Sequence, residues 1–195
     1  HDGLAQILGY VNTKAQAVRL LLARGQPEAA QGQLQQLEEA AGEVLADVRQ
    51  AILGLRLSAR PDLDLAGKLR SFVDQFSRQS GVAVHLDLPD ETHRLRLAPA
   101  MEVELLRIVQ EALANIRKHA DARSASLRLE SSGDGLWLTI ADDGSGFDPL
   151  QPTADDHFGL LSMRERAAAI GAKLDVDSGP GRGTRITVRL AAQED

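Results

Sequence analysis

Three polar residues at helical spacing between Pro99 and Ala120 have side chains suited to phosphate and metal chemistry. Glu111, Asn115 and Lys118 follow one another at steps of four and three, so a helix places them on one face. An amide oxygen such as that of Asn115 suits Mg²⁺, which takes few protein ligands and completes its shell with water and phosphates. A lysine neutralises phosphate oxygens, and a glutamate polarises a proton acceptor or a metal-bound water. The alternative interpretation is a solvated helix face without a ligand.

Three glycine clusters follow these residues along the chain. Glycine adopts backbone angles barred to other residues and lets a ligand approach the main chain closely. Asp142, which opens the first cluster, carries a carboxylate that can accept a hydrogen bond from the amino group of adenine. Each cluster alone is equally consistent with an ordinary turn, and the absence of a Gly-Lys-Ser/Thr phosphate loop excludes that class of nucleotide enzyme. The clusters are Asp142-Asp143-Gly144-Ser145-Gly146, His157-Phe158-Gly159-Leu160 and Gly179-Pro180-Gly181-Arg182-Gly183-Thr184.

Two amphipathic segments begin the chain. Apolar residues recur every three or four positions from Leu4 to Leu22 and again from Leu34 to Leu55, which is typical of helices that pack on other helices. Gly25 and Pro27 separate the segments, so we predict an antiparallel hairpin over residues 1–57. Two helices alone bury little apolar surface, and a homodimer with a four-helix bundle is the expected completion. The alternative is a helical packing element without a catalytic role.

The rest of the chain alternates between helical and strand periods. We predict a hinge over residues 58–64 and a second domain over residues 65–195. Helices on one face of a mixed sheet make a two-layer α/β sandwich, so the predicted fold class is α+β. The expected helices span residues 65–80, 99–120 and 159–170, and the expected strands lie near 82–88, 95–97, 125–129, 136–140, 174–176 and 186–190.

The segment that joins the first glycine cluster to the second differs in composition from its neighbours. Residues 143–157 are rich in glycine, proline and acidic side chains, which leave little to pack, so we predict a mobile lid there. A helix that begins at Gly159 presents its amino end, where backbone N–H groups favour a phosphate.

Composition excludes several classes of protein. The net charge is −6 and aromatic residues make up 3% of the chain, so neither a polyanion-binding surface nor a platform for stacking nucleic-acid bases is expected. The chain has no cysteine, which rules out disulfides and thiolate metal sites. No run of about 18 apolar residues occurs, so any membrane anchor is expected upstream of a chain that begins without Met.

The order and separation of the motifs resemble those of one known family. The string from Gln110 to Ala120, which includes Glu111, Asn115, Lys118 and His119, resembles the N box of histidine kinases. Asp142-x-Gly144-x-Gly146 resembles the G1 box, Gly159-Leu160 with Met163-Arg164-Glu165-Arg166 the G2 region, and Gly181-x-Gly183-Thr184 the last glycine motif. The resemblance covers residues 65–190 and implies the Bergerat ATP-binding fold shared with gyrase and MutL. It further implies that Asp142 reads adenine, that Asn115 with Glu111 holds Mg²⁺, and that the other box residues bind ATP.

The first residues resemble a second motif of the same family. His1-Asp2-Gly3-Leu4-Ala5-Gln6 looks like the H box of the NarX/DesK-like sensor histidine kinases. In that family the histidine is the phosphoacceptor, the adjacent acid is its general base, and the acid together with the glutamine supports dephosphorylation of the partner. Asp2 and Gln6 are i and i+4 neighbours on a helix, so one can hold the histidine while the other orients a water.

The resemblance implies a function and partners. The expected activity is ATP-dependent autophosphorylation of His1, aided by Glu111, followed by transfer to an aspartate in the receiver domain of a response regulator. The family's regulators often carry a helix-turn-helix output, and the segment itself is expected in the cytoplasm, with no direct contact to nucleic acid. Two alternatives share the ATP motifs: a Bergerat ATPase that drives a conformational clamp, and a nucleotide-sensing dimeric adaptor without histidine phosphorylation.

Overall fold

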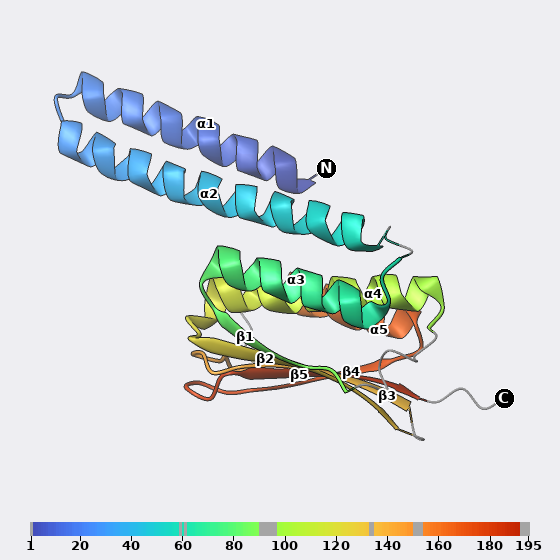
Figure 1. The fold of residues 1–195 in the computed structure, drawn as a ribbon. Helices are drawn as coiled ribbons and strands as arrows, with labels where there is room; N and C mark the ends of the chain where they lie inside the picture. Colours follow the sequence, from blue (N-terminus) through green and yellow to red (C-terminus); the bar gives the residue numbers. More distant parts are fainter. Residues whose placement is uncertain are drawn as a thin grey trace. The chain divides into compact units, whose positions relative to one another are not determined.

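Two amphipathic helices begin the chain, as the spacing of apolar residues predicts. In this computed structural model, which describes residues 2–58, 60, 62–89, 97–132, 135–149 and 154–191, α1 spans Asp2–Ala23 and α2 spans Pro27–Ser58 (Figure 1). Gly25 makes the turn between them with a φ of 70°, a value that glycine adopts without strain. Lys14 Nζ on α1 donates to Gln33 Oε1 on α2 over 2.8 Å, which ties the two helices together. The predicted hairpin is confirmed.

The described residues form two compact units, residues 1–49 and 50–195. The last turns of α2 belong to the second unit, where Leu57 joins the hydrophobic core at 6% exposure. Gly54 faces the side chain of Gln110 so closely that an added Cβ would lie 1.8 Å from its Nε2 atom. The division into a hairpin over 1–57, a hinge over 58–64 and a domain over 65–195 stays a prediction.

A five-stranded mixed sheet forms the base of the second unit. Its strands stand in the order β1-β2-β3-β5-β4, with β1 and β2 parallel and the other neighbours antiparallel. The antiparallel register places Ile140 of β3 opposite Ile186 of β5, so the carboxyl end of β3 lies beside the start of β5. The strands are β1 (Ala83–Asp87), β2 (Ser124–Ser132), β3 (Gly135–Asp142), β4 (Lys173–Ser178) and β5 (Thr184–Ala191).

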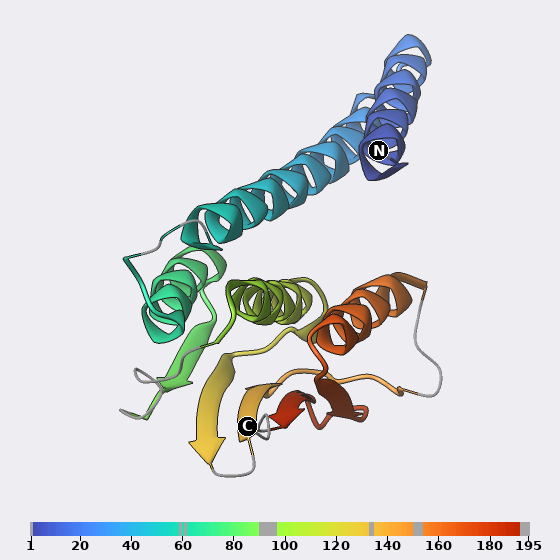
Figure 2. The same cartoon turned by 90° about the vertical axis from the view of Figure 1, so that its right-hand side faces the viewer.

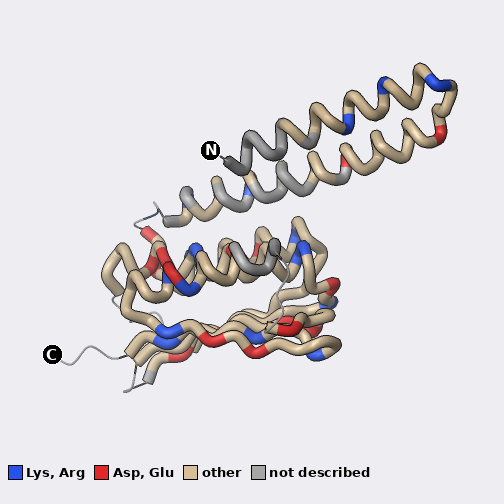
Figure 3. The backbone as a smooth tube through the Cα atoms, turned by 180° about the vertical axis from the view of Figure 1, so that it is seen from behind, with Lys and Arg blue, Asp and Glu red and all other residues tan. Residues whose placement is uncertain are grey.

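Three helices cover one face of this sheet, which confirms the predicted two-layer architecture (Figure 2). They are α3 (Leu65–Ser80), α4 (Pro99–Asn115) and α5 (Ala154–Ala169). Between the layers lies a core of fully buried aliphatic and aromatic side chains that includes Phe72, Phe76, Leu105, Leu127, Leu138 and Met163. Charged residues are distributed along the strands (Figure 3), among them Arg128, whose Nε lies 3.0 Å from Asp87 Oδ2.

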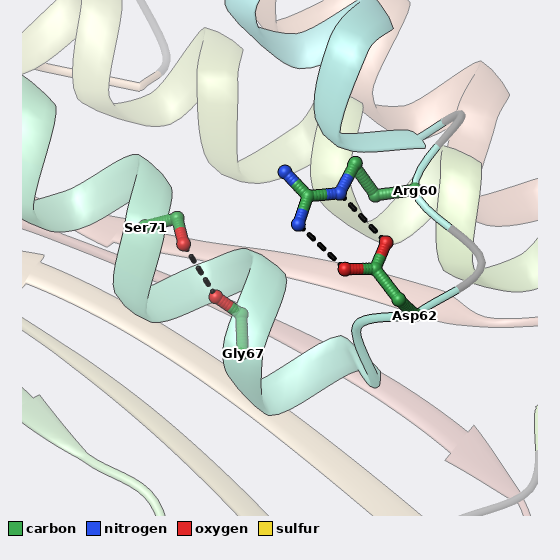
Figure 4. Close-up of polar contacts among 4 residues, drawn as sticks. All are labelled: Arg60, Asp62, Gly67 and Ser71. Atoms are coloured by element: carbon green, nitrogen blue, oxygen red, sulfur yellow. Dashed lines mark hydrogen bonds and ion pairs between the residues drawn. The ribbon is translucent and has the colours of Figure 1, made fainter.

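Local polar contacts fix the start and end of α3. Asp64 caps the helix by accepting a hydrogen bond from Gly67 N over 2.7 Å, and Gly81 ends it with a φ of 76°. Before the cap, Arg60 donates from Nε and Nη2 to the two carboxylate oxygens of Asp62 over 2.6 and 2.5 Å (Figure 4). The hydrogen bond from Arg60 lowers the pKa of Asp62 to about 2, so this exposed pair remains charged in mildly acidic solution.

The polar helix predicted over 99–120 changes its hydrogen bonding before it ends. After α4 the chain continues as a π-helical turn, η2 (Ile116–Ala120), and Asp121 then adopts a left-handed conformation with φ 48°. The apolar stripe expected on this helix, Leu105, Val109, Ala112 and Ile116, is buried. Single π-helical turns inside helices are frequently found at functional sites.

The structure differs from the expected start of one helix and does not support one expected strand. The helix expected to begin at Gly159 begins at Ala154, so Gly159 lies inside α5 and does not offer a free amino end to a ligand. The strand expected near 95–97 lies, apart from Leu97, outside the described residues, and Leu97 itself is not in a strand.

Candidate functional site

A cavity of about 450 Å³ lies between the helical layer and the sheet of the second unit. Its lining comes from α4, η2, β3, the segment after β3, α5 and β5. Seven of the residues singled out from the sequence line it, although they span 70 positions from first to last: Asn115, Lys118, His119, Asp142, Gly146, Leu160 and Thr184. The fold therefore brings the N-box and glycine-motif residues to one place.

The carboxylate of Asp142 occupies the sheet side of the cavity. Its Oδ1 accepts hydrogen bonds from Gly144 N over 2.9 Å and Thr184 N over 3.3 Å, which fixes the orientation of the carboxylate. Among the described residues both of these bonds end on Oδ1, so Oδ2 is the atom placed to accept from a ligand. Burial raises the pKa of Asp142, and the two backbone hydrogen bonds oppose that rise.

Glycine is required where the segments around the cavity approach each other. A Cβ on Gly144 would lie 2.2 Å from the carbonyl oxygen of Ala120, and one on Gly146 would lie 2.2 Å from that of Gly179. Gly146 also has a φ of 60°. The groups that approach these glycines are backbone atoms of the protein itself, and the close approach of a ligand stays a prediction.

The second glycine motif packs against the polar face of α4. A Cβ on Gly159 would lie 2.7 Å from Glu111 Oε1 and 3.3 Å from Asn115 Nδ2, so α5 crosses directly over these two side chains. Glu111 does not line the cavity, whereas Asn115 does. Gly144, Gly159, Gly181 and Gly183 do not line the cavity either.

The π-helical turn η2 joins the helical side of the cavity to the segment after β3. The carbonyl oxygen of Ala120 accepts from Ser145 N over 2.7 Å, and that of His119 accepts from Ser145 Oγ over 3.2 Å. These bonds hold the start of the segment predicted as a mobile lid. The prediction for residues 150–153 lies outside the described residues.

The side chains near the cavity suit a divalent cation that takes few ligands from the protein and most of them from a bound phosphate compound and water. Among the residues that the structure describes, no three histidine, aspartate or glutamate side chains gather as a metal site. Asn115 and Glu111 are neighbours beneath Gly159, and together they offer one amide oxygen and one carboxylate. Mg²⁺ commonly takes one or two such ligands and completes its octahedron with phosphate oxygens and water.

Sequence reasoning missed Asp143 as an anchor of the site. Its Oδ1 accepts from Arg123 N and Ser124 N, both over 2.9 Å, and its Oδ2 accepts from Ser124 Oγ over 2.8 Å. The bonds from the Ser124 amide and hydroxyl lower the pKa of Asp143. Neighbouring residues at a strand end point to opposite sides, so the Asp-Asp pair could have indicated that only one of the two faces the cavity.

The anchor predicts a pH-dependent stability. Because the pKa of Asp143 is lower in the folded chain than in the unfolded chain, its carboxylate stabilises the fold above the unfolded pKa, about 3.9, and this stabilisation is lost as pH falls through the folded pKa. Asp143→Asn should therefore lower the urea midpoint at pH 7, and its difference from the parent chain should shrink below the unfolded pKa. The fluorescence of Trp137, the single tryptophan, reports unfolding of the second unit.

Asp74→Asn serves as the matched control for that measurement. Asp74 is exposed on α3, and removing its charge should leave the urea midpoint unchanged at both pH values. An equal loss in Asp143→Asn at low and neutral pH would show that its carboxylate charge is not what stabilises the segment after β3.

The proposed H box cannot be compared with the structure. His1 lies outside the described residues, and Asp2 and Gln6 lie in α1 with side chains that are not described. Their roles stay predictions.

Comparisons with known proteins cover both units of the chain. The family profile described as "Histidine kinase" matches residues 1–60, and that described as "Histidine kinase-, DNA gyrase B-, and HSP90-like ATPase" matches residues 100–194. The signal transduction histidine-protein kinase/phosphatase DegS of Brevibacillus brevis is 32% identical over 97% of this chain and 48% of its own length. UhpB of Salmonella typhimurium, of the same description, is 36% identical over 97% of this chain and 37% of its own length. The chain thus spans half or less of these relatives.

The fold also has a counterpart among solved structures. The histidine kinase domain of the blue-light activated histidine kinase EL346 from Erythrobacter litoralis superposes with a TM-score of 0.57 over 97% of this chain and 94% of that one, at 18% identity. At that identity the likeness concerns the fold alone.

None of the described helices is long and apolar enough to cross a membrane.

Proposed function

This chain belongs to the histidine kinase family, and from that premise we propose that it is an ATP-dependent protein-histidine kinase that phosphorylates His1 and passes the group to a response regulator. The observation that carries the proposal is the cavity that gathers Asn115, Lys118 and Asp142 from α4, η2 and β3. An adenine base beside Asp142 and phosphates beside Asn115 and Lys118 would fill such a cavity with matched donors and acceptors.

The side chains around the cavity suit phosphoryl transfer. This reaction asks the protein mainly to position the groups and to neutralise charge. Asp142 would accept from the adenine amino group, and Lys118 and the glycine amides would steady the β- and γ-phosphates. Asn115, with Glu111 beside it, would hold Mg²⁺, which would supply positive charge to the phosphates when bound. Asp2 would take the proton of one imidazole nitrogen of His1 as the other attacks the γ-phosphorus, with ADP leaving.

The hairpin supports a homodimer as the working form. In the single chain its apolar seam is largely exposed: Val11 is 37% exposed, Leu22 56%, Leu34 44% and Val48 49%. Exposed leucine and valine at coiled-coil spacing favour burial against a second hairpin in a four-helix bundle. We retain residues 1–57 as the dimerisation and phosphotransfer hairpin, 58–64 as the hinge and 65–195 as the ATP-binding domain.

The partner and compartment follow from the proposed activity. A response regulator receiver domain would dock near His1 and accept the phosphoryl group on an aspartate. Asp2 and Gln6 would support the later hydrolysis of that phosphoryl group from the regulator. A helix-turn-helix output on that regulator fits the family pattern. The proposed compartment is the cytoplasm, which supplies the ATP that the reaction would consume.

Labelling with γ-³²P ATP and Mg²⁺ tests the proposal. Phosphohistidine is labile in acid and stable in alkali, so the purified chain should acquire label with that pattern, and a receiver domain added afterwards should remove it. Released phosphate without labelled protein would support the ATPase clamp instead. The absence of both protein label and released phosphate would support the nucleotide-sensing adaptor.

A further inference from the structure

One buried hydroxyl joins the two glycine segments that border the cavity. Ser178, at the end of β4, is 8% exposed. Its Oγ accepts from Phe147 N over 3.0 Å, donates to the carbonyl oxygen of Gly183 over 3.0 Å, and lies 3.0 Å from Thr184 Oγ1. Phe147 follows the first glycine cluster, and Gly183 and Thr184 end the last one, so a single side chain connects both.

The chemistry of the partners fixes every hydrogen in this group. The amide of Phe147 can only donate and the carbonyl of Gly183 can only accept, so Ser178 must give its one hydrogen to Gly183. The contact between the two hydroxyls is then a hydrogen bond only if Thr184 donates to Ser178. In this arrangement Ser178 is fully satisfied, and the hydrogen of the Thr184 hydroxyl points away from the cavity.

The orientation of the Thr184 hydroxyl affects the side of the cavity where Asp142 lies. Thr184 lines the cavity beside Asp142, and its amide donates to Asp142 Oδ1 over 3.3 Å. With its hydrogen committed to Ser178, the Thr184 oxygen offers only lone pairs to a ligand. An ionised carboxylate likewise only accepts. The Thr184 hydroxyl and the Asp142 carboxylate therefore present only acceptors to a ligand.

We propose that Ser178 is a positioning residue for base selection: by holding the Thr184 hydroxyl as an acceptor beside Asp142, it makes the cavity favour a purine with an amino group at C6 over one with a carbonyl there. The proposal rests on the adenine-nucleotide binding proposed above and deepens it. A carbonyl at C6 would face acceptors that cannot pair with it, and unpaired polar groups in a buried site cost binding.

Binding of ADP and of inosine diphosphate, measured by calorimetry with Mg²⁺, tests the proposal. Inosine diphosphate carries a C6 carbonyl in place of the amino group. The parent chain should prefer ADP, and Ser178→Ala should reduce the ratio of the two affinities by about tenfold, because the Thr184 hydroxyl becomes free to donate to the carbonyl. Ser178→Thr, which restores the hydroxyl, should restore the ratio.

A matched control and a double substitution separate selection from packing. Ser126→Ala removes a hydroxyl from β2 of the same sheet, outside the hydrogen-bonded group, and should leave the ratio unchanged. Thr184→Val should reduce the preference for ADP by itself, and in that background Ser178→Ala should have no further effect on the ratio. If Ser178→Ala fails to fold, the result for Thr184→Val decides.

The outcomes distinguish this proposal from the one on which it rests. Equal weakening of both nucleotides in Ser178→Ala, with the ratio kept, would show a packing role only and overturn the inference. An unchanged ratio in Thr184→Val would overturn it as well. A parent chain that binds neither nucleotide would instead refute the proposed ATP-binding function.

Discussion

Replacing His1 with glutamine is expected to abolish labelling of the chain by γ-³²P ATP while leaving nucleotide binding intact. Removal of a nucleophile typically costs a reaction several orders of magnitude, so the label should fall by at least about a thousandfold. The cavity that should bind ATP is lined by residues from 112 to 186, all remote from His1 in sequence, so the affinity for ADP should not change. Filter-bound acid-labile label and calorimetry with ADP measure the two effects.

His85→Gln is the matched control for this substitution. His85 is exposed on β1, outside the cavity, and the same change of residue type there should leave labelling unaffected. Acid-labile label that persists in His1→Gln but disappears in another histidine variant would assign the phosphoacceptor elsewhere. Asn115→Ala should also lose the label, through the loss of the proposed Mg²⁺ ligand.

The layered fold was predictable because burial repeats with a fixed period. Leu105, Val109 and Ala112 recur at helical spacing and all lie in the core, and alternating residues such as Leu136, Leu138 and Ile140 lie on the covered face of the sheet. A period of this kind reports which side of an element is covered. It does not report a change in hydrogen bonding, so the π-helical turn η2 could not be recognised from the same stripe.

The nucleotide cavity was predictable only in part. Asn115 and Lys118 are polar residues at helical spacing, and Asp142 opens a glycine-rich cluster, so all three could be recognised from the sequence. Ser178 and Asp143 act through hydrogen bonds to backbone groups that are distant in sequence, including Phe147 N and Arg123 N. A lone serine in a strand has no periodic signal, and its role depends on a register that only the folded sheet defines.

The glycine motifs are tightly packed in the structure, but not for the reason that the sequence indicated. The sequence indicated close approach of a ligand to the main chain, whereas Gly144 and Gly146 are approached by backbone carbonyls of η2 and the last glycine cluster. The loops must therefore pack on one another before they can surround a ligand. Substitutions that prevent this packing should remove the cavity wall and not only a single contact.

Gly183→Ala is the substitution that should damage this packing most. An added Cβ would lie 2.1 Å from the carbonyl oxygen of Asp142, a backbone atom that cannot move without shifting the end of β3. Gly183 also has a φ of 68°, which strains any residue with a side chain. Since hydrogen bonds from Gly144 N and Thr184 N orient the carboxylate of Asp142, the shift would displace the atom proposed to read adenine. Losing a hydrogen bond between a ligand and a charged group costs about 1.5–3 kcal/mol, so ADP affinity should fall by roughly tenfold to a hundredfold.

Gly81→Ala isolates the steric part of this effect. Gly81 ends α3 with a φ of 76°, but a Cβ there would have no atom within 4 Å, so the variant carries backbone strain without a clash. It should lose roughly 1–2 kcal/mol of stability and keep its affinity for ADP, because α3 takes no part in lining the cavity. Calorimetry with ADP and thermal unfolding of both variants give the comparison. An ADP affinity for Gly183→Ala close to that of Gly81→Ala would mean that the contact between the last glycine cluster and the end of β3 does not hold the adenine-reading carboxylate in place.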